Sequence, residues 1–144
     1  KTAHDLSHRN PGKVGAYIGF SEELSHQIEA GADMFVMPSR FEPCGLNQLY
    51  SQRYGTPPIV HATGGLVDSV VDCTAATLRD GTASGFMFNG MTAEDLLAAI
   101  RRAVGLYHDR SKWKALCKNC MDKDFSWERS AGTYRAVYLK VLGR

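Results

Sequence analysis

The sequence predicts an α/β fold in which a Rossmann-like parallel sheet is flanked by helices. Three observations support this fold class. Several short apolar runs each lead into a stretch with helical periodicity. The run over residues 34–37 is apolar throughout rather than alternating, as in a strand that is covered on both faces. The repetition of strand and helix at this spacing is typical of right-handed crossovers between parallel strands.

Composition limits the class of protein. The chain has 144 residues, a net charge of +2 and 44% hydrophobic residues, which is ordinary for one globular domain or a part of one and excludes a disordered chain. Its basic residues are scattered, which argues against a nucleic-acid surface. No apolar run approaches the ~18 residues of a membrane span. Four cysteines in this length indicate reduced thiols rather than a disulfide scaffold.

The first element that we expect is a strand over residues 14–18. Ser21 then occupies an N-cap position, and two acidic residues in the next turn favour the start of a helix. Leu24 and Ile28 share one face of this helix, and Gly31 is placed to end it in the left-handed conformation.

Residues 34–37 and residues 58–60 predict two further strands, the latter closed by His61. The helix between them stops at Gly55 and carries apolar side chains at Leu46, Leu49, Tyr50 and Tyr54. Residues 63–65 then open another helix, with inward side chains at Leu66, Val67, Val70 and Val71.

The second half of the chain predicts one strand and mostly helix. Residues 72–84 lack apolar periodicity and indicate a surface loop, and residues 85–88 predict the fourth strand. Thr92 caps a helix with an inward stripe of Leu96, Leu97, Ile100, Val104 and Tyr107. Ser111 caps the next helix, which turns Trp113, Leu116, Cys117, Cys120 and Met121 inward.

A last helix over residues 126–142 begins at Ser126 and directs Trp127, Ala131, Tyr134, Tyr138 and Val141 inward. We expect residues 1–144 to form a single, partial domain that ends in this helix. The first ten residues resemble the tail of an earlier segment, which indicates a fragment.

Ligands of parallel α/β sheets bind beyond the carboxyl ends of the strands. Two loops there each place glycine at a helix N-terminus: the Glu42 loop, residues 38–45, and the Gly64 loop, residues 61–66. Free backbone N–H groups at such a position can hold phosphate, and the missing Cβ lets it approach closely. The alternative is that these glycines only form tight turns.

Glu42 is the carboxylate of most interest, since it follows a strand and precedes a helix. It either complements the helix dipole or fixes a sugar beside the phosphate cradle. Phe20 follows the first predicted strand, so its ring stacks on a base or packs into the core. His61 either contacts a phosphate or sugar or is a hydrogen-bonded loop histidine. The remaining histidine and cysteine pairs, His4 with His8 and Cys117 with Cys120, lack further ligands, so we expect no metal site.

Three segments carry a resemblance to a known family. Residues 38–50 read PSRFEPCGLNQLY, residues 54–57 read YGTP, and residues 63–66 read TGGL; residues 124–127, DFSW, add a further match near the end. This set closely resembles the bacterial glycogen synthases and plant starch synthases. The resemblance implies most of the C-terminal, nucleotide-sugar-binding domain of a GT-B fold. It also implies retaining transfer of glucose from ADP-glucose to the non-reducing end of an α-1,4-glucan.

The resemblance implies a role for each matching residue. Glu42 corresponds to the essential catalytic glutamate that contacts the donor glucose, and Phe20 to an aromatic that packs on adenine. The positions implied in holding the donor glucose and phosphates are Cys44, Gly45, Leu46, Asn47, Thr63, Gly64 and Gly65. Asn47 departs from the threonine of many bacterial members. Tyr50 stands where other retaining GT-B enzymes have a second glutamate, as is usual in this family.

The same resemblance implies three partners: ADP-glucose, an α-1,4-glucan acceptor and an N-terminal GT-B domain absent from these residues. It implies no metal and no cofactor beyond the substrate. We expect neither nucleic acid nor membrane as a partner. The implied location is a bacterial cytoplasm or a plastid stroma. Because half of the composite site is missing, we expect the 144 residues alone to be inactive or nearly so. Two alternatives stay open: a non-catalytic nucleotide- or glucan-binding module, and another retaining GT-B transferase that uses UDP-glucose.

Overall fold

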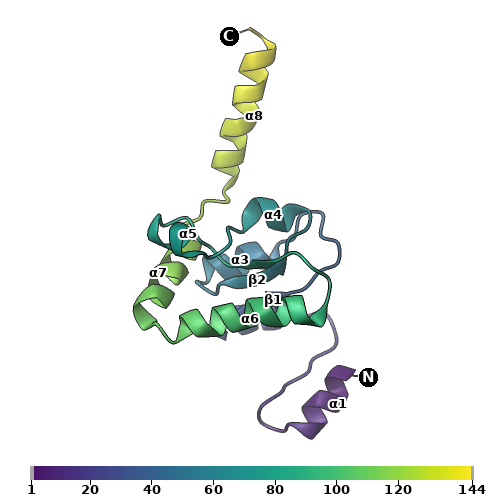
Figure 1. Cartoon of the computed structure of the whole chain (residues 1–144). Helices are drawn as coiled ribbons and strands as arrows, with labels where there is room; N and C mark the ends of the chain where they lie inside the picture. Colours follow the sequence, from purple (N-terminus) through teal and green to yellow (C-terminus); the bar gives the residue numbers. More distant parts are fainter. Residues whose placement is uncertain (1, 144) are drawn as a thin grey trace.

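The computed structural model describes residues 2–143 and contains a three-stranded parallel sheet with helices on both faces (Figure 1). The strands are β1 (Phe35–Met37), β2 (Pro58–His61) and β3 (Phe86–Phe88). The helices are α1 (Thr2–Arg9), α2 (Glu22–Gly31), α3 (Asn47–Arg53), α4 (Gly65–Ser69), α5 (Ala75–Arg79), α6 (Ala93–Tyr107), α7 (Arg110–Met121) and α8 (Trp127–Val141). The predicted α/β class with a parallel sheet is confirmed.

The sheet has the order β1-β2-β3, so the central strand is β2. Ile59 pairs with Phe86, and both belong to a buried cluster with Ala99 of α6 and Leu116 of α7. The next residue of the strand, Val60, belongs to a second cluster with Leu66 and Val70 around α4. Alternate residues of β2 thus lie in two different apolar layers, which explains why its sequence is apolar throughout.

Residues 14–18 do not form the predicted first strand. Within the described chain no strand pairs with them, and Tyr17 and Ile18 are exposed. An apolar run becomes a strand only when a neighbour supplies a hydrogen-bonded ladder, so the composition alone was misleading here. Ser21 does cap α2, accepting a hydrogen bond from the Leu24 N–H at 3.2 Å. Gly31 is the last helical residue rather than a left-handed cap, because the chain leaves through Ala32 in an extended conformation.

The predicted surface loop over residues 72–84 contains a short helix, α5. Thr74 and Thr77 form a reciprocal capping box there, a local device that apolar periodicity does not reveal. Ala83 and Ser84 at its end are fully buried. The helix expected to begin at Ser111 starts earlier, because the Asp109 carboxylate accepts the Lys112 N–H at 3.1 Å and takes the cap position.

Several residues expected to face inward are exposed. The buried residues of α6 are Ala99 and Ala103, whereas Leu97 and Val104 are exposed. Val67 of α4 and Met121 of α7 are also exposed. Small alanines let α6 approach the sheet closely, and the long side chains flank that contact line.

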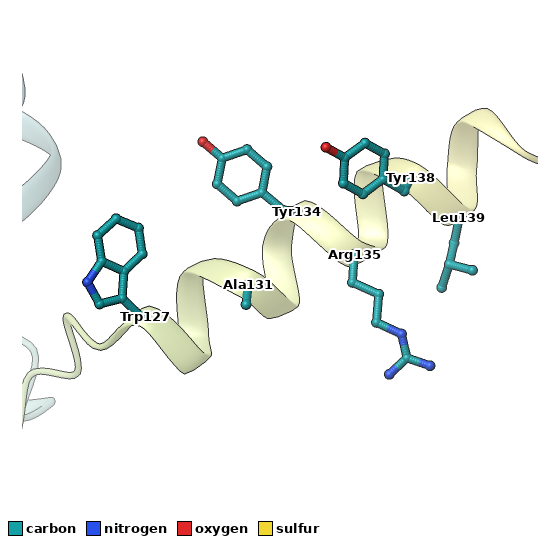
Figure 2. A pocket seen from close by; sticks show the side chains of 6 residues that line it. All are labelled: Trp127, Ala131, Tyr134, Arg135, Tyr138 and Leu139. Carbon is teal, nitrogen blue, oxygen red and sulfur yellow. The ribbon is translucent and has the colours of Figure 1, made fainter.

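The last helix, α8, projects away from the sheet and its layers (Figure 1). It begins at the predicted Ser126 cap, which accepts the Arg129 N–H at 3.3 Å. It buries none of its residues, so the predicted inward stripe is wrong. Trp127, Tyr134 and Tyr138 project from one side of the helix into solvent (Figure 2).

Candidate functional site

The Glu42 loop and the Gly64 loop lie side by side at the carboxyl ends of β1 and β2. The Gly65 N–H donates a hydrogen bond of 3.0 Å to the Glu42 carbonyl oxygen. A Cβ at Gly64 would lie 1.9 Å from that same oxygen, and a Cβ at Gly65 would lie 2.6 Å from the Cys44 Cα. Both positions therefore require glycine, because the two backbones touch.

The two loops differ in their free backbone donors. No described residue accepts a hydrogen bond from the N–H groups of residues 45–48, at the start of α3. In the Gly64 loop, by contrast, the N–H groups of Gly65 and Leu66 already donate to backbone carbonyls, as does that of Val67 just after the loop, and only the Gly64 N–H at this helix start has no described acceptor. The Glu42 loop thus presents most of the available donors, and the Gly64 loop packs against it.

Glu42 is half-buried, and its Oε2 accepts a hydrogen bond of 3.3 Å from the Ser39 hydroxyl. His61 lies beneath the same loop: its Nδ1 is 3.0 Å from the Ser39 carbonyl oxygen, and its Nε2 is 3.4 Å from that of Asn89. Both ring nitrogens thus lie next to backbone carbonyls, and the ring is buried. These contacts favour the interpretation of His61 as a hydrogen-bonded loop residue.

The other predicted site residues are accessible. Cys44, Leu46 and Asn47 are exposed, and Thr63 is half-buried. The ring of Phe20 is 92% exposed, which excludes the alternative that it packs in the core. An uncovered aromatic ring is free to stack on a planar ligand.

A polar layer lies under α3 that was not predicted from the sequence. Gln48, Ser51 and Gln52 are all fully buried, while Tyr50 and Tyr54 on the same helix are exposed. Residues 48 and 52 have the i, i+4 spacing of one helix face, which is the signal that could have identified them. That signal is weak, since polar residues at this spacing normally mark a solvated face.

The described residues offer neither a metal site nor a membrane-spanning helix. Among residues 2–143, no three or more histidine, cysteine, aspartate or glutamate side chains gather in a way that could bind a metal. Within the same residues, none of the helices combines the length and apolarity that crossing a bilayer requires.

Comparison with known proteins gives consistent matches. The model of the family "Glycosyl transferases group 1" matches residues 5–118. The glycogen synthase of Nitrosospira multiformis is 58% identical over 139 residues, and that of Aromatoleum aromaticum is 60% identical over 131 residues. These alignments cover 96% and 91% of this chain but 28% and 26% of the relatives. The chain therefore spans little more than a quarter of their length.

Solved structures lead to the same group. The catalytic domain of starch synthase IV from Arabidopsis thaliana, bound to ADP and acarbose, superimposes with a TM-score of 0.83 at 37% identity, over 98% of this chain and 29% of that one. Sucrose-phosphate synthase from Thermosynechococcus elongatus gives a TM-score of 0.66 at 26% identity, over 97% of this chain and 33% of that one. The chain belongs to the group 1 glycosyl transferases and, within them, to the glycogen and starch synthases.

Proposed function

We propose that this chain supplies the donor-binding part of a synthase that transfers glucose from ADP-glucose to the non-reducing end of an α-1,4-glucan, with retention of anomeric configuration. The observation that carries the proposal is the contact between the Glu42 loop and the Gly64 loop, of which the first has several backbone N–H groups without an acceptor. This pair of loops occurs in a chain that is 58% identical to a glycogen synthase. ADP is the nucleotide bound in the similar starch synthase IV structure, which supports the choice of donor.

The chemistry assigns separate tasks to the residues of the Glu42 loop. When the bond between the donor glucose and its diphosphate breaks, negative charge accumulates on the leaving oxygen and positive charge on the sugar ring. Backbone N–H groups from Gly45 to Gln48 can stabilise the first, and the Glu42 carboxylate can fix and stabilise the second. An acceptor hydroxyl then bonds to the sugar carbon, and its proton passes to the diphosphate of the departing ADP.

The remaining residues would hold the donor. Phe20 would stack on adenine, Cys44 and Leu46 would line the glucose and phosphates, and Asn47 would lie near the distal phosphate. Thr63, Gly64 and Gly65 would keep the neighbouring loop close enough to define that wall of the site. A nucleotide-binding part without the rest of the synthase lacks acceptor contacts, so we expect these 144 residues to bind ADP but not to elongate glucan.

Calorimetry tests the binding half of the proposal. The chain should bind ADP in preference to UDP, and Glu42→Ala should weaken binding of ADP-glucose while leaving ADP almost unchanged, since Glu42 is assigned to the sugar. Glu128→Ala is the matched control: it removes an exposed carboxylate from the first turn of α8 and should change neither affinity. Tighter binding of UDP than of ADP would favour the alternative donor, and equal affinity for both would contradict the expected preference.

A chimera tests the catalytic half. Residues 1–144 can replace the corresponding segment of the Nitrosospira multiformis glycogen synthase, and glycogen elongation from ADP-glucose can then be measured. We expect the chimera to be active and Glu42→Gln in it to lose about 10³-fold in kcat, the scale of a lost transition-state contact. An active Glu42→Gln chimera would contradict the catalytic role. An inactive chimera that still binds ADP would favour the non-catalytic module.

A further inference from the structure

The buried polar layer under α3 joins the two loops of the site. Gln48 is fully buried, and its Nε2 lies 3.0 Å from the Cys44 carbonyl oxygen and 3.1 Å from that of Gly45. The same Nε2 lies 3.1 Å from the Ser69 hydroxyl, which in turn donates 2.7 Å to the Gly65 carbonyl oxygen. One side-chain pair therefore contacts the backbone of both loops.

The donor and acceptor roles in this pair can be assigned. Carbonyl oxygens only accept, so the atom of Gln48 that faces two of them must be the amide nitrogen. The single proton of Ser69 goes to Gly65, so Ser69 accepts from Gln48. The two hydrogens of the Gln48 amide are thus shared among three acceptors, the Cys44 and Gly45 carbonyl oxygens and the Ser69 hydroxyl.

The hydrogen bonds to Gln48 also fix the direction of the N–H groups in the same two peptides. The Cys44 carbonyl shares a peptide plane with the Gly45 N–H, and the Gly45 carbonyl shares the next with the Leu46 N–H. In a trans peptide the C=O and N–H point in opposite directions, and the described chain has no cis peptide bond. Holding both carbonyls on Gln48 therefore turns the N–H groups of Gly45 and Leu46 away from it.

Gln48 is not fully satisfied at this position. Its Oε1 is buried without a hydrogen-bond partner, which is unfavourable. A leucine of nearly the same volume would avoid that penalty but would leave the Cys44 and Gly45 carbonyls without their side-chain donor. A Cβ at Gly45 would also lie 2.4 Å from this Oε1, so the glutamine fits only against glycine.

We propose that Gln48 and Ser69 are positioning residues that orient the Gly45 and Leu46 N–H groups toward the donor phosphates and fix the Gly64 loop beside them. This inference rests on the proposed function for the identity of the ligand. The orientation of the peptides is independent of it. Gln52 supports the pair, because its Nε2 donates to the backbone carbonyls of Gln48 at 3.0 Å and Ser69 at 3.2 Å.

The test compares Ser69→Ala with Ser84→Ala. Ser84 is fully buried, and its hydroxyl accepts a hydrogen bond of 3.0 Å from the Val71 N–H. It precedes β3, at the opposite end of the parallel strands from the two loops. Both variants should lower the melting temperature. Only Ser69→Ala should shift the amide nitrogen resonances of Gly45 and Leu46 and weaken ADP binding, by about tenfold, the equivalent of one lost hydrogen bond. Ser69→Thr keeps the hydroxyl and should restore both properties.

Four other results would contradict the proposal or the function on which it rests. Unmoved Gly45 and Leu46 resonances in Ser69→Ala overturn the inference, as does unchanged ADP affinity beside a parent that binds. Equal loss of affinity in Ser84→Ala shows a merely structural effect and also overturns it. If the parent itself does not bind ADP, the proposed function fails, and the resonances of the ligand-free protein alone decide whether the pair orients the peptides.

Discussion

Replacing Gly64 by alanine should separate the two loops of the site. The added Cβ would lie 1.9 Å from the Glu42 carbonyl oxygen, and real Cβ contacts essentially never fall below 3.0 Å, so the backbones must move apart by at least 1.1 Å. Gly64 also has φ +46° and ψ −135°, a region that disfavours side chains. Overpacking and backbone strain together predict a loss of about 3–4 kcal/mol in the free energy of unfolding.

The same displacement should affect binding more than a remote change of equal cost. A shift of about 1 Å in a positioning element reduces function by up to about 10²-fold, so ADP affinity should fall by about 10–100-fold. Urea unfolding and calorimetry measure the two effects. Gly105→Ala is the control, because Gly105 lies within α6 and nothing stands within 4 Å of its added Cβ; it should gain up to about 1 kcal/mol. If Gly64→Ala behaved like Gly105→Ala in both assays, the claim that the loops touch would be refuted.

Three further changes test other parts of the chain. Burial raises the pKa of the Glu29 carboxyl above its ordinary value of 4.5. The protonated carboxyl therefore contributes stability below pH 4.5, and this contribution is lost as the pH rises through the raised pKa of the folded state. Glu29→Gln should unfold at higher urea than the parent at pH 7 and show no advantage below pH 4.5. Asp72→Ala should cost about 1–2 kcal/mol in urea unfolding, since Asp72 accepts the Met87 N–H at 2.7 Å, while its partly exposed ion pair with Arg102 adds little; Asp72→Asn should retain most of that stability. The exposed aromatic side of α8 should make the chain associate with rising concentration in sedimentation experiments, and replacing Trp127 by serine should reduce that association; equal behaviour of parent and variant would show that this side of α8 is not responsible.

The sequence was sufficient to predict the elements that form the sheet. Residues 34–37, 58–60 and 85–88 were expected as strands, and each contains or overlaps one of β1, β2 and β3. β2 and β3 are largely buried, so hydrophobicity and structure agree there. The expectation that residues 34–37 are covered on both faces is wrong, because β1 lies at the edge of the sheet and Val36 is exposed. Residues 14–18 have the same character but no partner strand in the described chain, and pairing is a tertiary property that local composition does not contain.

The candidate site was predicted in part. The adjacency of the Glu42 loop and the Gly64 loop followed from the rule that parallel strands end at one edge, and the structure shows them in contact. The difference between the loops in free backbone N–H groups could not be predicted, because it depends on which N–H groups each loop uses in its own hydrogen bonds. Gln48 and Ser69 were missed for a related reason: polar residues on a short helix are normally solvated, and only three-dimensional packing shows that these are enclosed.

The isolation of α8 has a consequence for how unfolding is observed. A helix of 15 residues that buries none of them is marginal in water, so α8 should exchange its amide hydrogens and lose ellipticity well before the sheet opens. The two tryptophans of the chain divide between these events, since Trp113 is 6% exposed in the core and Trp127 is 84% exposed on α8. Fluorescence of Trp113 therefore follows global unfolding, whereas circular dichroism mixes it with the earlier fraying of α8.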